Sequence, residues 1–186
     1  MTTQTHYFIA IPIDKVVKQK LSEWNTKELP PFQRFVHEDD LHITLAFLGG
    51  LELPVLDALK DKLLKITRNL DPFSLTIDTL GHFGQKQSPR IFWASVKQEN
   101  KLFQLQNEVY QTCIDVGIEL EKRAYSPHIT LARKYIGEGT YVEEHLQESF
   151  QKYLKNESWT VSSFVIYQTH LKRIPKYEVV ATFQFL

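Results

Sequence analysis

The five-residue word His-Ile-Thr-Leu-Ala occurs twice in the chain, at residues 42–46 and again at residues 128–132. The copies are separated by nearly half of the 186 residues, and an exact repeat in so short a chain indicates an internal duplication. Each copy is rich in β-branched and aliphatic residues and alternates polar with apolar positions, which is the pattern of a half-buried strand. The repeat therefore predicts two equivalent strands, one in each half of the chain.

Regular alternation assigns each residue of these strands to a face, because successive strand side chains point to opposite sides of a sheet. One face is expected to carry the polar residues and the alanines: His42, Thr44 and Ala46 in the first copy, and His128, Thr130 and Ala132 in the second. The other face is expected to be apolar, with Leu41, Ile43, Leu45, Phe47, Ile129 and Leu131. We therefore expect each strand to present a His-x-Thr pair to a cleft, where the two pairs form a symmetric site.

Composition and charge exclude several classes of function. The chain is 42% hydrophobic and 24% charged, as in ordinary globular proteins. Its 22 basic residues balance 22 acidic ones, which argues against a protein that coats long nucleic acid but allows a local basic pocket. The single cysteine, Cys113, excludes an internal disulfide, fits a reducing compartment, and lies in an apolar helical stripe where burial is expected.

The sequence contains no sign of membrane insertion or export. No apolar run approaches the ~20 residues of a membrane-spanning helix. Residues 1–5 lack the basic and apolar blocks of a signal peptide. We therefore expect a cytoplasmic monomer without a membrane partner.

The remaining patterns predict the order of the elements. Helices are expected from the N-cap Asp14 to about residue 27, over 54–70, and over 100–116, with Gly117 as a C-cap glycine. Strands are expected at 7–13, 32–36, 73–77, 90–96, 159–169 and 177–185, besides the two repeat strands. Residues 81–89 are predicted to form a loop, and residues 137–156 a loop with a short helix. The resulting fold is a single α+β domain over residues 1–186, bilobal and pseudo-duplicated, with antiparallel sheets that line a central groove and helices outside.

Two histidines in one site favour proton transfer. Imidazoles titrate near neutral pH, so one neutral histidine can accept a proton from water while a protonated one donates to a leaving oxygen. The threonine hydroxyls on the same face can donate hydrogen bonds to the oxygens of a phosphorus centre. This chemistry suits phosphoester hydrolysis without a metal. Acyl transfer fits less well, because no serine or cysteine is visibly paired with a base.

The chain resembles a known family, the 2H phosphoesterase superfamily, which is defined by two H-x-T-x motifs. It is most similar to the bacterial and archaeal branch of RNA 2′,3′-cyclic phosphodiesterases, also called 2′-5′ RNA ligases. The resemblance covers nearly the whole chain and is carried by Phe8–Pro12, by the segments 41–49 and 127–133 around the two motifs, by 89–94, and by 177–179.

The resemblance implies hydrolysis of an RNA terminal 2′,3′-cyclic phosphate to a 2′-phosphate, with neither cofactor nor metal. It assigns His42 as proton donor to the 3′ oxygen and His128 as proton acceptor from water. Thr44 and Thr130 correspond to substrate-binding threonines, and Phe8 and Arg133 to positions that contact the nucleotide. Regular alternation would put Arg133 on the face opposite His128, so we expect it to lie past the end of its strand. Many relatives have tryptophan where this chain has Phe35. This difference leaves the expected chemistry unchanged but weakens any prediction of which base the site prefers.

Three other interpretations remain open. The substrate could instead be a 2′-5′-linked oligonucleotide or a small cyclic nucleotide, or the chain could bind RNA ends without turnover. Glu38 and Asp40 could join His42 in a metal cluster, although the second motif brings no carboxylate. Phe92 and Trp93 are expected in the core, and Arg90 is either a phosphate anchor or a solvated strand end. The other histidines, His6, His37, His82, His145 and His170, are expected to be surface or local residues.

Overall fold

The computed structural model describes residues 5–138 and 143–186. The helices and short 3-10 turns are α1 (Lys15–Glu28), η1 (Glu38–Asp40), α2 (Leu53–Ile66), η2 (Thr67–Asn69), α3 (Asn100–Asp115) and α4 (Glu143–Leu154). The strands are β1 (His6–Pro12), β2 (Phe32–Phe35), β3 (His42–Gly50), β4 (Phe73–Gln85), β5 (Ser88–Val96), β6 (Ile129–Tyr135), β7 (Ser158–Val161), β8 (Ser163–Thr169) and β9 (Tyr177–Gln184).

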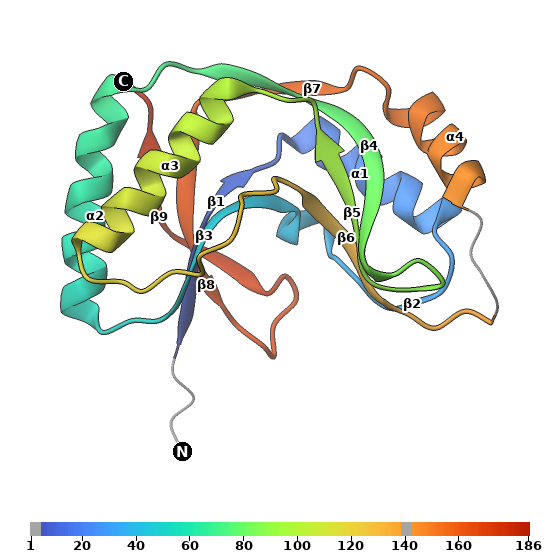
Figure 1. Cartoon of the computed structure of the whole chain (residues 1–186), viewed down its shortest axis with the longest axis horizontal. Coiled ribbons are helices and arrows are strands. Elements are labelled where there is room, and N and C mark those ends of the chain that lie inside the picture. Colours follow the sequence, from blue (N-terminus) through green and yellow to red (C-terminus); the bar gives the residue numbers. More distant parts are fainter. Residues whose placement is uncertain (1–4, 139–142) are drawn as a thin grey trace.

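All nine of these strands belong to one curled antiparallel sheet with the order β7-β4-β5-β6-β3-β1-β8-β9, and β2 pairs with β6 (Figure 1). The sheet has two wings that meet where β3 pairs with β6. The first wing contains β1, β3, β8 and β9, and the second contains β2, β4, β5, β6 and β7. The predicted α+β class with antiparallel strands is confirmed, and the strands form one continuous sheet.

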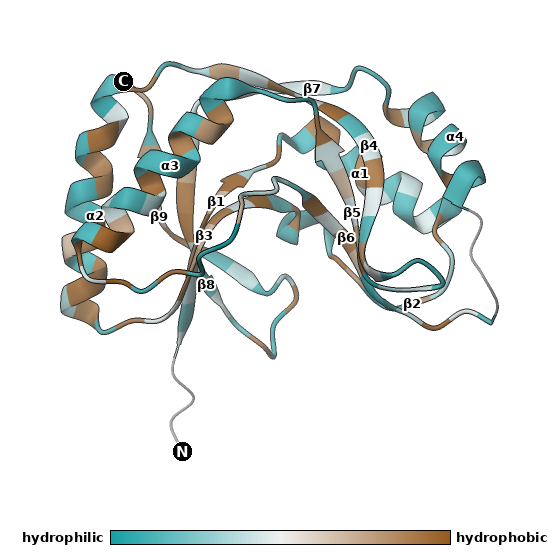
Figure 2. Cartoon of the chain, viewed as in Figure 1, coloured by the Kyte–Doolittle hydropathy of each residue, from teal (hydrophilic) through white to brown (hydrophobic). Residues whose placement is uncertain are grey.

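The helices cover the sheet from outside, as expected, but the wings do not coincide with the two halves of the chain. Helices α2 and α3 pack on each other and on the first wing, whereas α1 and α4 pack together on the second (Figure 1). Each wing therefore combines elements from both halves of the sequence. In Figure 2, apolar and polar bands alternate along the helices, as amphipathic packing requires. None of the helices in the described part of the chain is long and apolar enough to cross a membrane.

The predicted helices are confirmed, with small differences at their ends. Helix α1 begins after Asp14, whose carboxylate accepts a hydrogen bond from the backbone N–H of Val16 at 2.9 Å. Gly117 follows α3 with φ of 85°, the left-handed conformation typical of a residue after a helix. Cys113 is fully buried in α3, and burial raises the pKa of its thiol to about 12, so its predicted place in the core is confirmed.

The predicted loop at residues 81–89 is wrong. Strand β4 continues to Gln85, and Lys86 and Gln87 form a two-residue turn before β5. The glycines suggested a loop, but they serve the hairpin: Gly84 has φ of 98° beside a register shift, and the indole of Trp93 lies directly over Gly81. A second difference lies at 159–169, where the strand pairing is interrupted at Ser162 and gives separate strands β7 and β8.

Both repeat strands contain a β-bulge at the leucine of the repeated word. In β3, Ala46 and Thr44 pair with consecutive residues of β1, which leaves Leu45 as the extra residue. In β6, Ala132 and Thr130 pair with consecutive residues of β5, which leaves Leu131 as the extra residue. An inserted residue reverses the alternation beyond it. The two bulges are therefore a second sign of the duplication.

The bulges correct the predicted faces of four residues. Ala46 and Ala132 are buried on the core side and do not share the face of the histidines. Phe47, expected on the buried face, is 58% exposed. Arg133 lies within β6, not past its end, and the bulge turns it to the side of Thr130.

Candidate active site

The two repeat words face each other across the junction of the wings. Ile43 of β3 pairs directly with Ile129 of β6 in antiparallel register. This register aligns His42 with Thr130 and Thr44 with His128, one residue to either side of that pair. The duplication thus brings the two predicted His-x-Thr pairs onto neighbouring strands, where each imidazole lies across from the hydroxyl of the other copy.

Both imidazoles are held in the same way by the chain that precedes them. Nδ1 of His42 lies 2.7 Å from the carbonyl oxygen of Asp40, and Nδ1 of His128 lies 2.7 Å from that of Ser126. Since a carbonyl oxygen only accepts, Nδ1 carries a hydrogen in each ring, and Nε2 is the nitrogen left to exchange protons. Nε2 of His42 lies 3.1 Å from the hydroxyl oxygen of Thr44.

Aromatic rings surround His42. The ring centroids of Phe8, Tyr177 and Tyr167 lie 4.9, 5.3 and 5.9 Å from that of His42. Phe8 is itself only 4% exposed and packs edge-on with Tyr177. The rings therefore restrict the orientation of His42 and exclude water from one side of it.

His128 has a smaller aromatic contact surface from the β4–β5 hairpin. Phe83 lies edge-on to it at 5.1 Å between centroids, and Trp93 lies at 6.0 Å. Trp93 is only half-buried, so its expected place in the core is wrong, whereas Phe92 is 1% exposed as predicted. A Cβ at Gly81 would come within 2.2 Å of the Trp93 ring, so this position must be glycine for the indole to lie where it does.

The environment lowers the pKa of both histidines, mainly through burial. The pKa of His42 falls to about 4, because burial and the charges of His128 and Arg133 outweigh the opposing effects of the Asp40 carbonyl and carboxylate. Burial also lowers the pKa of His128, helped by the charges of Arg133 and Arg123 and opposed by the carbonyl of Ser126. In the free protein at neutral pH, both rings are therefore mostly neutral.

Two cavities lie near the histidines: His128 itself lines the smaller one, whereas the larger one is lined by Asp40 and Tyr177, which contact His42. The larger, about 610 Å³, is lined by three cationic side chains (Arg34, Arg133 and Lys176), by the buried Asp40, and by Phe35 and Tyr177 among others. Phe35 is 51% exposed there. The smaller, about 120 Å³, is lined by Thr44, His128, Phe47 and Tyr125 among others. The cationic side chains give the larger cavity the positive character that suits a phosphate-bearing ligand.

Of the site residues expected from the sequence, the structure brings both histidines, both threonines, Phe8 and Arg133 into this one region. Arg90 is exposed at a strand end and lines neither cavity. The alternative metal cluster of Glu38, Asp40 and His42 does not form, since the Asp40 carboxylate binds backbone N–H groups. Within residues 5–138 and 143–186, no three His, Cys, Asp or Glu side chains converge as metal ligands would.

Several residues of the site could not be found from the repeat. Phe83 fell in the predicted loop, and Trp93 was assigned to the core. Tyr167 and Tyr177 come from the last two strands, far from either motif in sequence. For Tyr177 the segment 177–179 gave a signal, but only as part of the family resemblance.

Comparison with known proteins agrees with this fold and site. The sequence profile of the 2′-5′ RNA ligase superfamily matches residues 14–173. A Geobacillus stearothermophilus protein named RNA 2′,3′-cyclic phosphodiesterase is 38% identical over 185 residues, which cover 98% of this chain and 58% of that protein. A Bacillus subtilis protein of the same name is 34% identical, with 96% of each chain covered.

Solved structures give the same result. The structure of Escherichia coli LigT complexed with 3′-AMP matches with a TM-score of 0.81 and 26% identity, over 98% of this chain and 99% of that one. The chain therefore belongs to the 2′-5′ RNA ligase superfamily, the two-histidine phosphoesterases that its sequence resembles. Within this superfamily, it is similar to bacterial RNA 2′,3′-cyclic phosphodiesterases, and it spans little more than half of the Geobacillus relative.

Proposed function

We propose that this protein hydrolyses 2′,3′-cyclic phosphates at RNA ends to 2′-phosphates, by general acid–base catalysis with two histidines and no metal. The observation that carries the proposal is the matched pair His42 and His128, each with Nδ1 bound to a carbonyl and Nε2 available for proton transfer. The names of the bacterial relatives support the reaction and the substrate class.

In the proposed step, His128 accepts a proton from water as the water oxygen attacks phosphorus. The bond between phosphorus and the ribose O3′ breaks, and His42 gives its proton to that oxygen. The products are a 3′ hydroxyl and a 2′-phosphate. After the reaction His128 releases its extra proton and His42 takes one up, which restores both histidines for the next cycle. Because the reacting group is an anion, its binding favours the charged form of His42 and offsets part of the effect of burial on the pKa.

The assignment of donor and acceptor has a structural argument as well as the family resemblance. Phe8, Tyr167 and Tyr177 enclose His42, whereas His128 follows an exposed Ser126 and lines the smaller cavity. The attacking water needs an approach from solvent, and the leaving oxygen needs a shielded donor. These requirements favour His128 as acceptor and His42 as donor.

The remaining groups would bind the substrate. Thr44 and Thr130 would donate hydrogen bonds to the phosphate oxygens that do not react, where negative charge grows in the transition state. Arg133, which lines the larger cavity, would contact the same phosphate or the next one along the RNA. Phe8 is buried behind His42, so its proposed contribution is mainly to support the imidazole.

The test is hydrolysis of a short RNA that ends in a 2′,3′-cyclic phosphate, in excess chelator, with His42→Ala and His128→Ala measured alongside. We expect a 2′-phosphate product, identified by ³¹P NMR, and loss of turnover in both variants. His145→Ala is the matched control, because His145 is exposed on α4. Turnover that requires added metal would contradict the mechanism, and binding without turnover would favour a module that only recognises RNA ends.

A further inference from the structure

The two copies of the repeat differ sharply two residues before each histidine. In the first copy this position is Asp40, which is 5% exposed, and in the second it is Ser126, which is exposed. Both use the backbone carbonyl to hold Nδ1 of the histidine. Only the first copy thus adds a buried carboxylate close to its imidazole.

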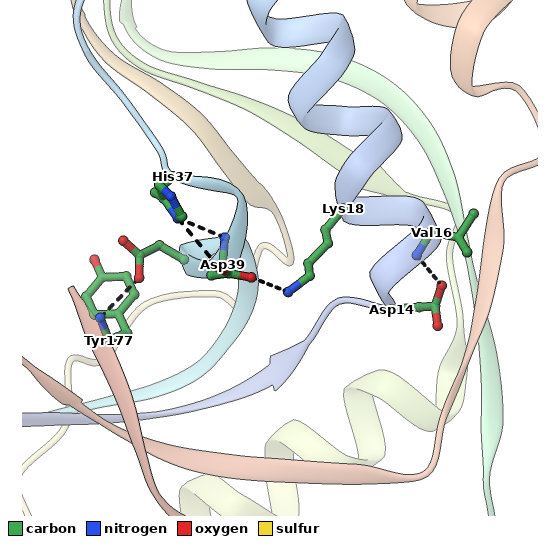
Figure 3. A network of polar contacts seen from close by, with 7 residues as sticks. Asp14, Val16, Lys18, His37, Asp39 and Tyr177 are labelled. Atoms are coloured by element: carbon green, nitrogen blue, oxygen red, sulfur yellow. Dashed lines mark hydrogen bonds and ion pairs between the residues drawn. The ribbon is translucent and has the colours of Figure 1, made fainter. Parts of the chain in front are cut away.

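The Asp40 carboxylate connects the first copy to the C-terminal hairpin. Its Oδ2 accepts a hydrogen bond from the backbone N–H of Lys176 at 2.9 Å, and its Oδ1 accepts one from Tyr177 at 3.0 Å. These bonds attach the start of β9 to η1, and the ring of Tyr177 then packs edge-on against His42 at 5.3 Å. Figure 3 shows this corner, with the backbone nitrogen of Tyr177 on one side of the η1 turn and Lys18 bound to Asp39 on the other.

We propose that Asp40 is a positioning residue that holds His42 in the orientation of the proton donor and favours its protonated form, and so makes the two histidines unequal. The proposal rests on the function proposed above. The carbonyl of Asp40 fixes the tautomer of His42, its carboxylate holds Tyr177 against the ring, and its negative charge favours the imidazolium form. Asp40 does not touch the reacting atoms; it acts through His42.

The charges around His42 show why one carboxylate matters. His128, just before β6, and Arg133 of β6 both disfavour the protonation of His42. Tyr167 of β8 and Tyr177 of β9 face His42 as neutral phenols, because burial raises the pKa of each. Among the described groups that act on the charge of His42, Asp40 is the one carboxylate. The corresponding charged neighbours of His128 are two arginines, Arg123 and Arg133, which favour its neutral form.

The test compares Asp40→Asn with Asp39→Asn, a matched control that removes a carboxylate from the adjacent position. Asp39 is exposed and bound to Lys18, 2.6 Å away. The protonated fraction of each histidine is followed by ¹⁵N NMR against pH, in the free protein and with adenosine 2′-monophosphate bound. For Asp40→Asn we expect the His42 midpoint to fall by about one pH unit and the maximal kcat/KM to fall about tenfold. In Asp39→Asn both quantities should stay at the wild-type values.

The direction of the change in kcat/KM also reports the role of His42. A lower His42 midpoint reduces the population with His42 protonated and His128 neutral, so the maximal kcat/KM falls if His42 is the donor and does not fall if His42 is the acceptor. An unchanged His42 midpoint in Asp40→Asn would overturn the proposal, even if activity fell. A midpoint that rose would overturn it as well, because loss of structure around His42 exposes the ring and raises its pKa. Absence of turnover in the wild-type protein would instead contradict the proposed function, and the NMR titration would still test Asp40.

Discussion

Ile43 and Ile129, the second residue of each repeated word, lie directly opposite each other where the two wings of the sheet join. Equivalent residues that pair with one another define a local two-fold axis between them. This axis relates His42 to His128 and Thr44 to Thr130, and it explains why two copies of one short word are enough to form a site. The surroundings break the symmetry, with three aromatic rings and a buried carboxylate on the His42 side.

The pH dependence of kcat/KM should be bell-shaped with a maximum below pH 6.5. Below the lower pKa of the pair both rings are protonated and no base remains; above the higher pKa both are neutral and no acid remains. Since both values lie below 6.5, and that of His42 is about 4, the maximum lies on the acidic side. Initial rates at low substrate concentration from pH 3.5 to 8 would check this, and a maximum above pH 7.5 would contradict it.

Folding stability should fall as the pH is lowered from 6.5 to 4. In this window the unfolded chain binds a proton at residue 42 that the folded protein excludes, because the pKa of His42 is lowered to about 4 on folding. Linkage gives a loss of up to about 3 kcal/mol in the free energy of unfolding. Urea denaturation at several pH values should show a shallower dependence in His42→Gln, whereas His145→Gln, on an exposed helix face, should keep the wild-type slope.

Arg133→Gln should move the bell-shaped profile to higher pH. The guanidinium of Arg133 lowers the pKa of both histidines, so its removal lets both rise, by about half a unit. KM should also increase, because Arg133 lines the larger cavity. Arg90→Gln is the control, since Arg90 is exposed at a strand end. A profile that stays in place while KM increases would limit Arg133 to binding.

Gly81→Ala should lower activity through Trp93. A Cβ at residue 81 would lie 2.2 Å from the indole, which must then shift and so change its contact with His128. We expect a loss of about tenfold in kcat/KM, of the size that small misplacements cause. The smaller ring in the double variant Gly81→Ala/Trp93→Phe should restore part of the activity. If the double variant were worse than both single variants, the clash would not be the cause.

Thr44→Val should lower kcat by about 10- to 100-fold, because it removes a hydroxyl that can stabilise the transition-state charge and that lies 3.1 Å from Nε2 of His42. Thr44→Ser keeps the hydroxyl and should retain most of the activity. Valine has nearly the same shape, and the Thr44 carbonyl still accepts the hydroxyl of Tyr125, so the fold should survive. Equal kcat values for the valine and serine variants would argue against this role.

The parts of the site that follow from local pattern could be predicted from the sequence. The repeated word gave the two strands and their His-x-Thr pairs, and Asp14 and Gly117 marked helix ends correctly. Strict alternation failed at Leu45 and Leu131, because a bulge depends on the register with β1 and β5, which no single strand encodes. For the same reason, strict alternation assigned the wrong face of the sheet to Ala46, Phe47, Ala132 and Arg133.

Tertiary contacts account for the other differences. Gly81 and Gly84 looked like loop residues, but Gly81 is needed because an indole from the next strand covers it. For the carboxylate of Asp40 the sequence offered only a disfavoured alternative, a metal cluster, whereas its partners are backbone groups more than a hundred residues away. The donor and acceptor roles of the two histidines, the single-domain organisation and the monomeric state remain predictions.

The exchange of elements between the wings determines when the site can exist during synthesis. The chain passes between the wings several times, and the first wing is completed by β8 and β9 at the C-terminus. Tyr167 and Tyr177, which enclose His42, arrive with those last strands. A growing chain that already carries both histidines therefore lacks these two rings beside His42 until β8 and β9 have left the ribosome and joined the sheet.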